Sequence, residues 1–423
     1  MSDSWTWRPL GELFEIGAGK TMSAAARAGE NKIPFLRTSN VFWDRLDLSA
    51  VDEMSIPRHE FPDKLVEAGD LLVCEGGEIG RAAIWDGSIA PMAFQNHLHR
   101  LRPKRDDVDP RFYVFFLQSA FTQLGIFEGA GNKTTIPNLS SGRLAALEVP
   151  HPSLPDQQAV VEVLGKLREA DFVHAELRAG AYEMKRAAME RLFRIGIQGG
   201  GQQETAIGLV PDGWVVEELG ASHSVQTGAT PSRSNARYWD GGTIPWVKTA
   251  EVSYSTILET SEQITSAALE ETTVKLFPAG TLLLAMYGQG VTRGKVGKLA
   301  IEATCNQACA AIQCSRGEVD PDFLYYFLEW QYEGIRARAH GGQQQNLSLD
   351  IVRKIPIAYP TSLNEQGEIA GLLAAIDRKI ELHQARLDRL GELYQRMLLA
   401  IMTGEVSADD FVLPPRKTAG SAA

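Results

Sequence analysis

The chain repeats itself over almost its whole length. Trp5 recurs as Trp214, an offset of 209 residues. The same offset relates a set of leucine, glycine and threonine positions, which are Leu10, Gly11, Gly19 and Thr21 against Leu219, Gly220, Gly228 and Thr230. Further on, residues 33–38 match 244–249 and residues 68–72 match 279–283, an offset of 211. Because this period is about half the chain, far above the ~20–50 residues of solenoid repeats, it indicates a tandem duplication of whole domains.

The composition leaves room for two or three hydrophobic cores. The chain has 423 residues, of which 44% are hydrophobic, and this suits two repeated domains with connecting helices. No segment approaches the ~20 consecutive apolar residues of a membrane span, and residues 1–6 lack the features of a secretory signal. Four cysteines are too few and too unevenly placed for a disulfide framework. We therefore expect a cytoplasmic protein with reduced thiols.

The net charge limits how this chain can bind nucleic acid. Its formal value is −11 at pH 7. Affinity for DNA comes largely from neutralising phosphates with lysine and arginine. An acidic chain must therefore gather these residues on one face or borrow positive charge from a partner.

Each copy begins with a pattern of short strands and a few helices. Residues 68–74 and 82–85 are short apolar runs bounded by glycine, which is typical of buried strands. After Pro110, phenylalanine and leucine recur at three- and four-residue spacing, which predicts an amphipathic helix, and the second copy repeats this after Pro321. We predict an α+β fold class with pseudo-symmetric globular domains over residues 1–153 and 214–361.

Each domain is followed by a long helical pattern, over residues 154–195 and 362–403. Apolar residues there alternate steps of four and three, as in a coiled coil. The predicted seam is Val163, Leu167, Leu177 and Met184 in the first helix, and Leu373, Ile376, Ile380, Leu387, Leu390 and Met397 in the second. Such a seam needs a partner helix, and the most economical partner is the repeat in the same chain. We predict two long antiparallel coiled-coil helices that separate the domains, each ~60 Å long at ~1.5 Å per residue.

Two segments lack periodicity. Residues 196–213 contain a Gly-Gly-Gly-Gln-Gln run and are expected to form a flexible linker. Residues 404–423 contain Pro414 and Pro415 followed by small polar residues, and we expect a disordered tail.

Motifs that suggest catalysis are incomplete. Residues 17–21 look like the end of a phosphate-binding loop, but the motif requires glycine where Phe14 stands, and the second copy has Ala229 in place of Lys20. The three cysteines of the second half lack a nearby histidine as a further zinc ligand, so buried thiols are the better interpretation. We find no nucleophile with a base, no metal cluster and no cofactor loop. The sequence favours a binding and assembly protein over an enzyme.

A series of short motifs follows the same order in both halves. In the second half they are residues 207–214, 244–249, 292–297, 305–308 and 363–366. The first half carries matching segments at residues 77–81 and 154–158. In order and duplication, these motifs resemble the specificity (S) subunit of type I restriction-modification systems, and the resemblance covers the chain apart from its tail.

The resemblance implies a non-catalytic DNA-recognition subunit. Each of two target-recognition domains would read one half of a split, asymmetric sequence, while the two helices would set the spacer and dock methyltransferase subunits. The implied partners are double-stranded DNA, two methyltransferase (M) subunits and restriction/translocase (R) subunits. S-adenosylmethionine, ATP and magnesium would belong to those partners, and no cofactor is expected in this chain.

Base reading needs amide and guanidinium groups on loops that can reach the major groove. The first-domain candidates are Lys20, Thr21, Arg37, Thr38, Asn40, Arg81, Gln95, Asn96, His97, Asn132, Lys133 and Thr134. Those of the second domain are Thr230, Ser232, Arg233, Lys248, Thr249, Tyr287, Gln289, Arg293, Lys295, Asn306, Gln307, Gln343, Gln344 and Gln345. Pairs that recur in both copies, such as Gln95-Asn96 and Asn306-Gln307, more plausibly hold a loop or a phosphate. Segments that differ between the copies are the better specificity candidates.

The exposed faces of the helices are candidates for contacts with partner subunits. In the first helix the charged candidates are Glu183, Lys185, Arg186, Glu190, Arg191 and Arg194. The sequence leaves two other interpretations open. One is the recognition subunit of a related restriction system that cuts on both sides of its site, and the other is a coiled-coil scaffold with no DNA role.

Overall fold

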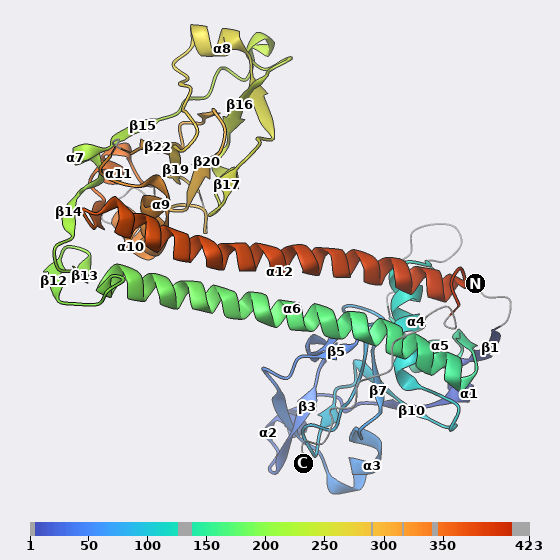
Figure 1. The fold of residues 1–423 in the computed structure, drawn as a ribbon. Helices are drawn as coiled ribbons and strands as arrows, with labels where there is room; N and C mark the ends of the chain where they lie inside the picture. Colours follow the sequence, from blue (N-terminus) through green and yellow to red (C-terminus); the bar gives the residue numbers. More distant parts are fainter. Residues whose placement is uncertain (1–4, 126–137, 289–290, 315–316, 341–345, 408–423) are drawn as a thin grey trace, which may run out of the picture. The chain divides into compact units, whose positions relative to one another are not determined.

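A computed structural model describes residues 5–125, 138–288, 291–314, 317–340 and 346–407. The chain forms two compact units (Figure 1). Unit 1 comprises Met1–Ala175 and Ala385–Ala423, and unit 2 comprises Glu176–Gln384. The unit borders fall inside both long helices. Each unit therefore combines one globular domain with a part of each helix.

The domain of unit 1 is built on a four-stranded antiparallel sheet. Its strands, in spatial order, are β2 (Phe14–Ala18), β10 (Leu98–Pro103), β7 (Leu71–Cys74) and β8 (Ala82–Ile84). Helix α4 (Pro110–Thr122) shares one core with this sheet, and that core includes Phe112, Phe115 and Phe116. The Asp109 side chain accepts a hydrogen bond from the Arg111 backbone N–H and caps α4, with Pro110 in its first turn. The predicted buried strands and amphipathic helix are confirmed.

A smaller layer completes the same domain. It contains β6 (Asp52–Ser55), β3 (Lys32–Leu36) and β9 (Ala93–Phe94), with α2 (Ala24–Ala28) beside them. This layer has its own small core, which includes Ala26, Phe35 and Met54. The hairpin of β4 (Val41–Phe42) and β5 (Arg45–Leu46) follows β3 in the chain. The pairing of β1 (Thr6–Pro9) with β11 (Glu148–His151) joins the beginning of the domain to its end.

The domain of unit 2 repeats this α+β architecture. Its main sheet has the order β15 (Ser224–Thr227), β22 (Cys309–Gln313), β19 (Leu282–Ala285), β20 (Val296–Leu299) and β17 (Thr256–Ile257), and α9 (Pro321–Trp330) packs in the same core. The smaller layer contains β18 (Glu262–Ile264), β16 (Ile244–Val247) and β21 (Thr304–Cys305), with α8 (Ser266–Glu271). The pair β14 (Val215–Glu218) and β23 (Pro356–Tyr359) corresponds to β1 and β11. The predicted fold class is confirmed.

Two short helices of unit 1, α1 (Leu10–Leu13) and α5 (Ser141–Ala145), are equivalent to α7 (Leu219–Ser222) and α11 (Leu349–Arg353) of unit 2. The short helices α3 (Phe61–Lys64) in unit 1 and α10 (Tyr332–Ala337) in unit 2 lie at different places in the repeat. Ser140 caps α5 and Ser348 caps α11, each by accepting a hydrogen bond from a backbone N–H three residues on. The duplication therefore extends to the ends of short elements.

The two long helices are α6 (Leu154–Ile195) and α12 (Leu363–Thr403), green and red in Figure 1. Within unit 2, Arg178 of α6 hydrogen-bonds Gln384 of α12. One heptad further along α6, Lys185 pairs with Asp377, which lies one heptad back along α12. The helices therefore run antiparallel, as predicted.

The seam positions predicted for the second helix are all at least half-buried. Leu373 and Ile380 are buried, and the remaining members, Ile376, Leu387, Leu390 and Met397, are half-buried. In the first helix, Val163 is buried and Leu167 is half-buried.

The prediction was wrong for Leu177 and Met184, which are 49% and 53% exposed. The seam positions there are the next residues, Arg178 and Lys185, which contact α12 through polar groups. Because both are charged, hydrophobicity alone placed the seam one residue too early. The 209-residue offset from Leu387 identifies Arg178 as its counterpart.

The predicted flexible linker is an ordered hairpin. Within residues 196–213, β12 (Gln202–Thr205) pairs with β13 (Gly208–Pro211). The Arg194 guanidinium donates to the carbonyls of Ile207 and Leu209, and Val210 is fully buried. The hydrogen bonds from the end of α6 thus add to those within the hairpin, such as the bond from Thr205 to the Gly208 carbonyl. Residues 408–423 of the predicted tail lie outside the described residues.

A buried glutamine attaches each domain to the start of its own long helix. The Gln157 side chain accepts a hydrogen bond from the Asp109 backbone N–H (2.8 Å) and donates to the carbonyls of Asp107 (3.0 Å) and Pro152 (2.9 Å). In unit 2 the Gln366 side chain makes the equivalent bonds to Asp320, Glu318 and Pro360, at 2.7–2.9 Å. Both glutamines are fully buried. Three satisfied hydrogen bonds fix the direction in which each helix leaves its domain.

Candidate nucleic-acid interface

The first-domain candidates from three distant segments meet at the ends of β2, β3 and β9. Lys20 and Gln95 form an isolated parallel bridge, and the Asn96 N–H donates to the Lys20 carbonyl (3.1 Å). The Gln95 N–H donates to the carbonyl of Leu36, the residue before Arg37 (2.9 Å). Gly19 permits this approach, because a Cβ there would lie 2.2 Å from the Gln95 carbonyl oxygen.

Lys20 and Arg37, the two cationic candidates in this region of the first domain, already form ion pairs with acidic side chains. The Lys20 Nζ lies 2.6 Å from Glu60 Oε2, and an Arg37 guanidinium nitrogen lies 2.9 Å from Asp52 Oδ2. The hydrogen bond from Lys20 lowers the pKa of Glu60. Glu60 is therefore ionised at neutral pH, and a phosphate that binds Lys20 must compete with this carboxylate.

Other first-domain candidates differ in their surroundings. Thr21 and His97 are exposed, and Thr38 is half-buried. Asn40 is buried: its Oδ1 accepts from the Arg37 N–H, and its amide donates to the carbonyls of Asp47 and Ala50. Because every polar atom of this side chain is used within its own loop, Asn40 holds the loop, and we remove it from the proposed DNA contacts.

The second domain forms the same surface with different side chains. Thr249 donates to Asn306 (2.9 Å), and Thr230 donates to Gln307. The Asn306-Gln307 pair thus occupies the place of Gln95-Asn96, and Lys248 occupies that of Arg37. Lys248 Nζ lies 3.0 Å from Glu262.

Arg233 is held by aromatic residues that the sequence interpretation missed. Its guanidinium lies 3.8 Å from the ring centroid of Trp239 and 4.8 Å from that of Trp246, and it forms an ion pair with Glu262. The two indole rings are perpendicular, with centroids 5.1 Å apart. The first domain has Ala24 at the position 209 residues earlier. The sequence signal that could have identified this arrangement is the pair of tryptophans seven residues apart, which the first copy lacks.

The remaining candidates lie elsewhere or outside the described residues. Ser232, next to Arg233, is exposed and contacts the Ser234 hydroxyl. The segment between β19 and β20 carries Tyr287, which is exposed, and Arg293 and Lys295, which are half-buried. Outside the described residues lie Asn132, Lys133, Thr134, Gln289, Gln343, Gln344 and Gln345.

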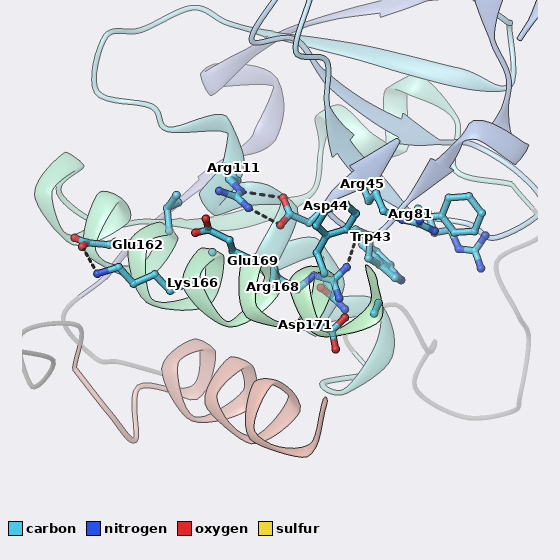
Figure 2. A pocket seen from close by; sticks show the side chains of 16 residues that line it. Trp43, Asp44, Arg45, Arg81, Arg111, Glu162, Lys166, Arg168, Glu169 and Asp171 are labelled. Carbon is cyan, nitrogen blue, oxygen red and sulfur yellow. Dashed lines mark hydrogen bonds and ion pairs between the residues drawn. The ribbon is translucent and has the colours of Figure 1, made fainter. Parts of the chain in front are cut away.

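Each unit also has a groove between its domain and the helix that follows it. In unit 1 the groove has a volume of about 770 Å³ and lies between α6 and the segment from Phe42 to Arg45 (Figure 2). Figure 2 shows Arg111 bound through two nitrogens to Asp44, and Arg168 bound to the Trp43 carbonyl. Arg81, a predicted DNA contact, lines this groove and stacks over the Phe42 ring at 5.1 Å.

The groove of unit 2 occupies the equivalent place in the repeat. It has a volume of about 680 Å³ and lies between α12 and the residues from Ser253 to Thr256. Tyr254, like its counterpart Asp44, has a positive φ, of 55° against 54°. Both grooves are lined by acidic and basic side chains together with aromatic residues.

Partner contacts predicted on α6 have mixed outcomes. Lys185 is buried in ion pairs, so its assignment to an exposed face was wrong. Glu190 accepts a hydrogen bond from Trp330 and pairs with Arg194 within unit 2. Glu183 and Arg186 are exposed and pair with each other. The charge pattern could not distinguish these environments.

In the part of the chain that is described, no group of three or more histidine, cysteine or acidic side chains could hold a metal ion. Burial raises the pKa of the Cys74 and Cys314 thiols to about 12, which makes them poor ligands and nucleophiles at neutral pH. Within the same described ranges, no helix is both long and apolar enough to cross a membrane.

Comparison with known proteins gives one consistent result. The family model of the type I restriction modification DNA specificity domain matches twice, over residues 2–178 and 211–392. The MjaX type I restriction enzyme specificity subunit of Methanocaldococcus jannaschii is 21% identical over 96% of this chain and 94% of its own length. The MjaIX specificity subunit of the same organism is 32% identical over 42% of this chain and 41% of its own.

Solved structures share the fold. The S subunit of a type I restriction-modification system from M. genitalium matches with a TM-score of 0.61, at 15% identity, over 94% of this chain and 96% of its own. A chain from a type I restriction-modification system solved for complex assembly matches with a TM-score of 0.58, at 16% identity, over 96% and 99%. Since the family model covers most of the sequence in two copies, the chain belongs to the family of type I restriction modification DNA specificity domains.

Proposed function

We propose that this chain is the DNA-recognition subunit of a type I restriction-modification complex, in which each domain reads one half of a bipartite, asymmetric target. The observation that carries the proposal is the double match of a DNA specificity domain, once to each structural repeat. The two candidate surfaces occupy equivalent places but carry different cations, which suits two different half-sites. Lys20 of the first domain is Ala229 in the second, and Arg233 of the second is Ala24 in the first.

Selection from a random duplex pool tests this function. The full chain, purified with its methyltransferase partner, is incubated with the pool, and bound DNA is sequenced after several rounds. We expect one motif with two defined parts and an unread spacer of fixed length. A single continuous motif, or no enrichment over the input pool, would contradict the proposal.

The paired grooves support the finer proposal of two methyltransferase subunits per chain. Because the grooves are related by the internal repeat, two identical partner subunits can dock in equivalent ways. Phe172 lines the groove of unit 1 and is 57% exposed, and Tyr182 lines that of unit 2 and is 55% exposed. Aromatic side chains exposed beside mixed charges suit a protein partner.

Native mass spectrometry of the assembled complex tests the stoichiometry and the grooves. We expect two methyltransferase subunits on the wild-type chain, one on each single variant, Phe172→Ser and Tyr182→Ser, and none on the double variant. Leu209→Ser, at an exposed leucine of β13, is the matched control and should keep both. Two subunits retained on the double variant would contradict docking in these grooves.

The proposed division of labour places the chemistry in other subunits. The methyltransferase subunits would hold S-adenosylmethionine, and the restriction/translocase subunits would hold ATP and magnesium. We propose that the complex acts in the cytoplasm, where its DNA target is accessible. The full chain alone should show no heat of binding with ATP or S-adenosylmethionine by calorimetry.

A further inference from the structure

Two buried polar clusters occupy equivalent positions of the repeat but contain different residues. The offset of 209 in the long helices relates Arg168 to Asp377 and Lys185 to Tyr394. The offset of 211 in α4 and α9 relates Gln118 to Glu329 and Phe115 to Tyr326. The same offsets relate Gln157 to Gln366 and the helix-capping residue Asp109 to Asp320. In both units the aspartate N–H donates to the glutamine side chain, so these offsets identify structurally equivalent residues.

The cluster of unit 2 is ionic. Lys185 Nζ lies 2.8 Å from Glu329 Oε1 and 2.8 Å from Asp377 Oδ1, and 5.2 Å from the ring centroid of Tyr326. The Tyr326 hydroxyl donates to Asp377 at 2.8 Å. The side chains of Lys185 and Glu329 are only 9% and 15% exposed. One buried ammonium thus pairs with two carboxylates.

The cluster of unit 1 contains no carboxylate among its four residues. The Tyr394 hydroxyl donates to Gln118 Oε1 at 2.6 Å. The Arg168 guanidinium lies 5.1 Å from the Tyr394 ring centroid, and the Phe115 ring packs edge-on against it at 6.4 Å. A neutral phenol therefore fills the position that Lys185 fills in unit 2.

In each unit, one residue of the cluster comes from the other half of the chain. Gln118 and Arg168 form a receiving site in the first half, and Glu329 and Asp377 form one in the second half. The inserted residue is Tyr394 in the first site and Lys185 in the second. The inserted residue always lies near the end of the long helix that follows the opposite domain.

We propose that these unlike clusters determine which helices pair, so that each half of the chain accepts the opposite half and rejects a second copy of itself. Two first halves would place the Lys185 ammonium beside the Arg168 guanidinium and the Gln118 amide. The nearby Asp44 carboxylate is already bound by Arg111. Two second halves would place Tyr394 beside Glu329 and Asp377, leaving buried negative charge without a cation. Breaking a buried ion pair in this way costs enough to favour the native pairing by about a hundredfold or more.

Such selection of the partner helix would prevent a mispairing that the duplication itself makes possible. The remaining seam is similar in both helices, and similar halves can exchange between chains or pair with themselves. Polar groups buried in a helical seam are a known means of specifying the partner, at some cost in stability. The inference needs only the fold and is independent of the proposed DNA recognition.

Exchanging the inserted residues in the full chain tests the proposal. In the variant Lys185→Tyr/Tyr394→Lys, residue 185 suits the receiving site of the first half and residue 394 suits that of the second half. Within one chain, however, residue 185 lies at the second site and residue 394 lies at the first, so neither is matched. We expect sedimentation velocity to show a shift toward dimers or larger species relative to wild type, with a lower melting temperature. Adding Gln118→Glu, Glu329→Gln, Arg168→Asp and Asp377→Arg exchanges the receiving sites as well, and should restore the wild-type sedimentation and melting temperature.

A matched control exchanges residues at a neighbouring equivalent pair. Ala187 and Arg396 are both exposed and are related by the same offset, so Ala187→Arg/Arg396→Ala moves a charge outside the clusters. It should sediment and melt as wild type does. The proposal is overturned if the double exchange at 185 and 394 sediments and melts like wild type. It is also overturned if the sixfold variant recovers neither property, since the clusters would then contribute packing without selecting a partner.

Discussion

At the residue scale, Arg233 is the side chain best prepared for base reading among the described candidates. Its side chain is 51% exposed, yet Trp239, Trp246 and Glu262 restrain the guanidinium. A fixed guanidinium suits bidentate contact with guanine, which is worth about 1–3 kcal/mol of discrimination. We predict that Arg233→Ala relaxes one base of the second half-site and leaves the first half-site unchanged, as measured by duplex-pool selection.

Arg237 provides the control for Arg233. It is also exposed and pairs with Glu271, and among the described residues no aromatic ring stacks on its guanidinium. Arg237→Ala removes the same charge and should leave the motif unchanged. An unchanged motif in Arg233→Ala as well would show that the stacked arginine has a structural role only.

His223 makes the stability of the second domain depend on pH. It is buried, and desolvation lowers its pKa below the ordinary value of 6.5. As pH falls below 6.5, the unfolded chain binds a proton that the folded chain does not, so stability falls. The equivalent residue of the first domain is the buried Phe14. We predict that His223→Phe loses less of its melting temperature than wild type between pH 7.5 and 5.5, and equal losses would be evidence against this account.

Single polar residues were the least predictable part of the interface. The sequence singled out Lys20, Arg37 and Gln95 as polar loop residues, but only the structure brings them into one region, through the Lys20–Gln95 bridge and the bond from the Gln95 N–H to the Leu36 carbonyl. It could not show that Asn40 turns inward, since its hydrogen bonds to Asp47 and Ala50 depend on how the loop closes. Nor could it identify the acidic partners of the cations, which come from other segments of the chain.

At the scale of elements, the buried glutamines are the points at which helix and domain are joined. We predict that Gln157→Ala destabilises unit 1 by about 2–3 kcal/mol, because it leaves a buried N–H and two carbonyls without their partner. Urea denaturation of the full chain measures this loss. The neighbouring Gln158 is exposed, so Gln158→Ala is the control and should change stability by less than about 0.5 kcal/mol. Equal midpoints for the two variants would refute the role of Gln157.

The helices show what periodicity can and cannot predict. Residues 362–403 have an apolar seam, and its position follows directly from the heptad pattern. In α6 the same seam includes Arg178 and Lys185, whose burial depends on Gln384, Asp377 and Glu329 in distant parts of the chain. Applying the internal repeat from the clear helix to the ambiguous one gives the correct phase. The hairpin β12–β13 was missed because some of its stabilising hydrogen bonds come from Arg194 in α6.

At the scale of the whole molecule, the length of the two helices is expected to set the spacer of the DNA target. One heptad adds ~10 Å to a helix, equivalent to about three base pairs of B-DNA. Insertions after Ala175 and after Gln384 fall at the borders of the compact units and keep the seam in phase. We predict a spacer about three base pairs longer with unchanged half-sites, measured by methylation mapping.

A five-residue insertion at the same two places is the control for the heptad insertion. It turns the seam by ~140° and should abolish methylation instead of lengthening the spacer. A heptad variant that methylates the original spacer would contradict the role of the helices as a ruler.

The duplication was the most informative property of the sequence. It predicted two α+β domains and two antiparallel helices without any structural information. It could not show that each compact unit takes parts of both helices, because the contacts of Tyr394 with Gln118 and of Lys185 with Glu329 join residues far apart in the chain. The identities of those residues matter only once the fold has placed them together.

The central claim is that two unlike domains of one chain define one bipartite methylation site. Genome-wide mapping of methylated adenine, with and without the gene for this chain, tests it most directly. The account predicts that deletion removes methylation at a single two-part motif, and that restoring the gene with Arg233→Ala returns a motif altered in one half only. Unchanged methylation after deletion, or a variant that alters both halves, would contradict it.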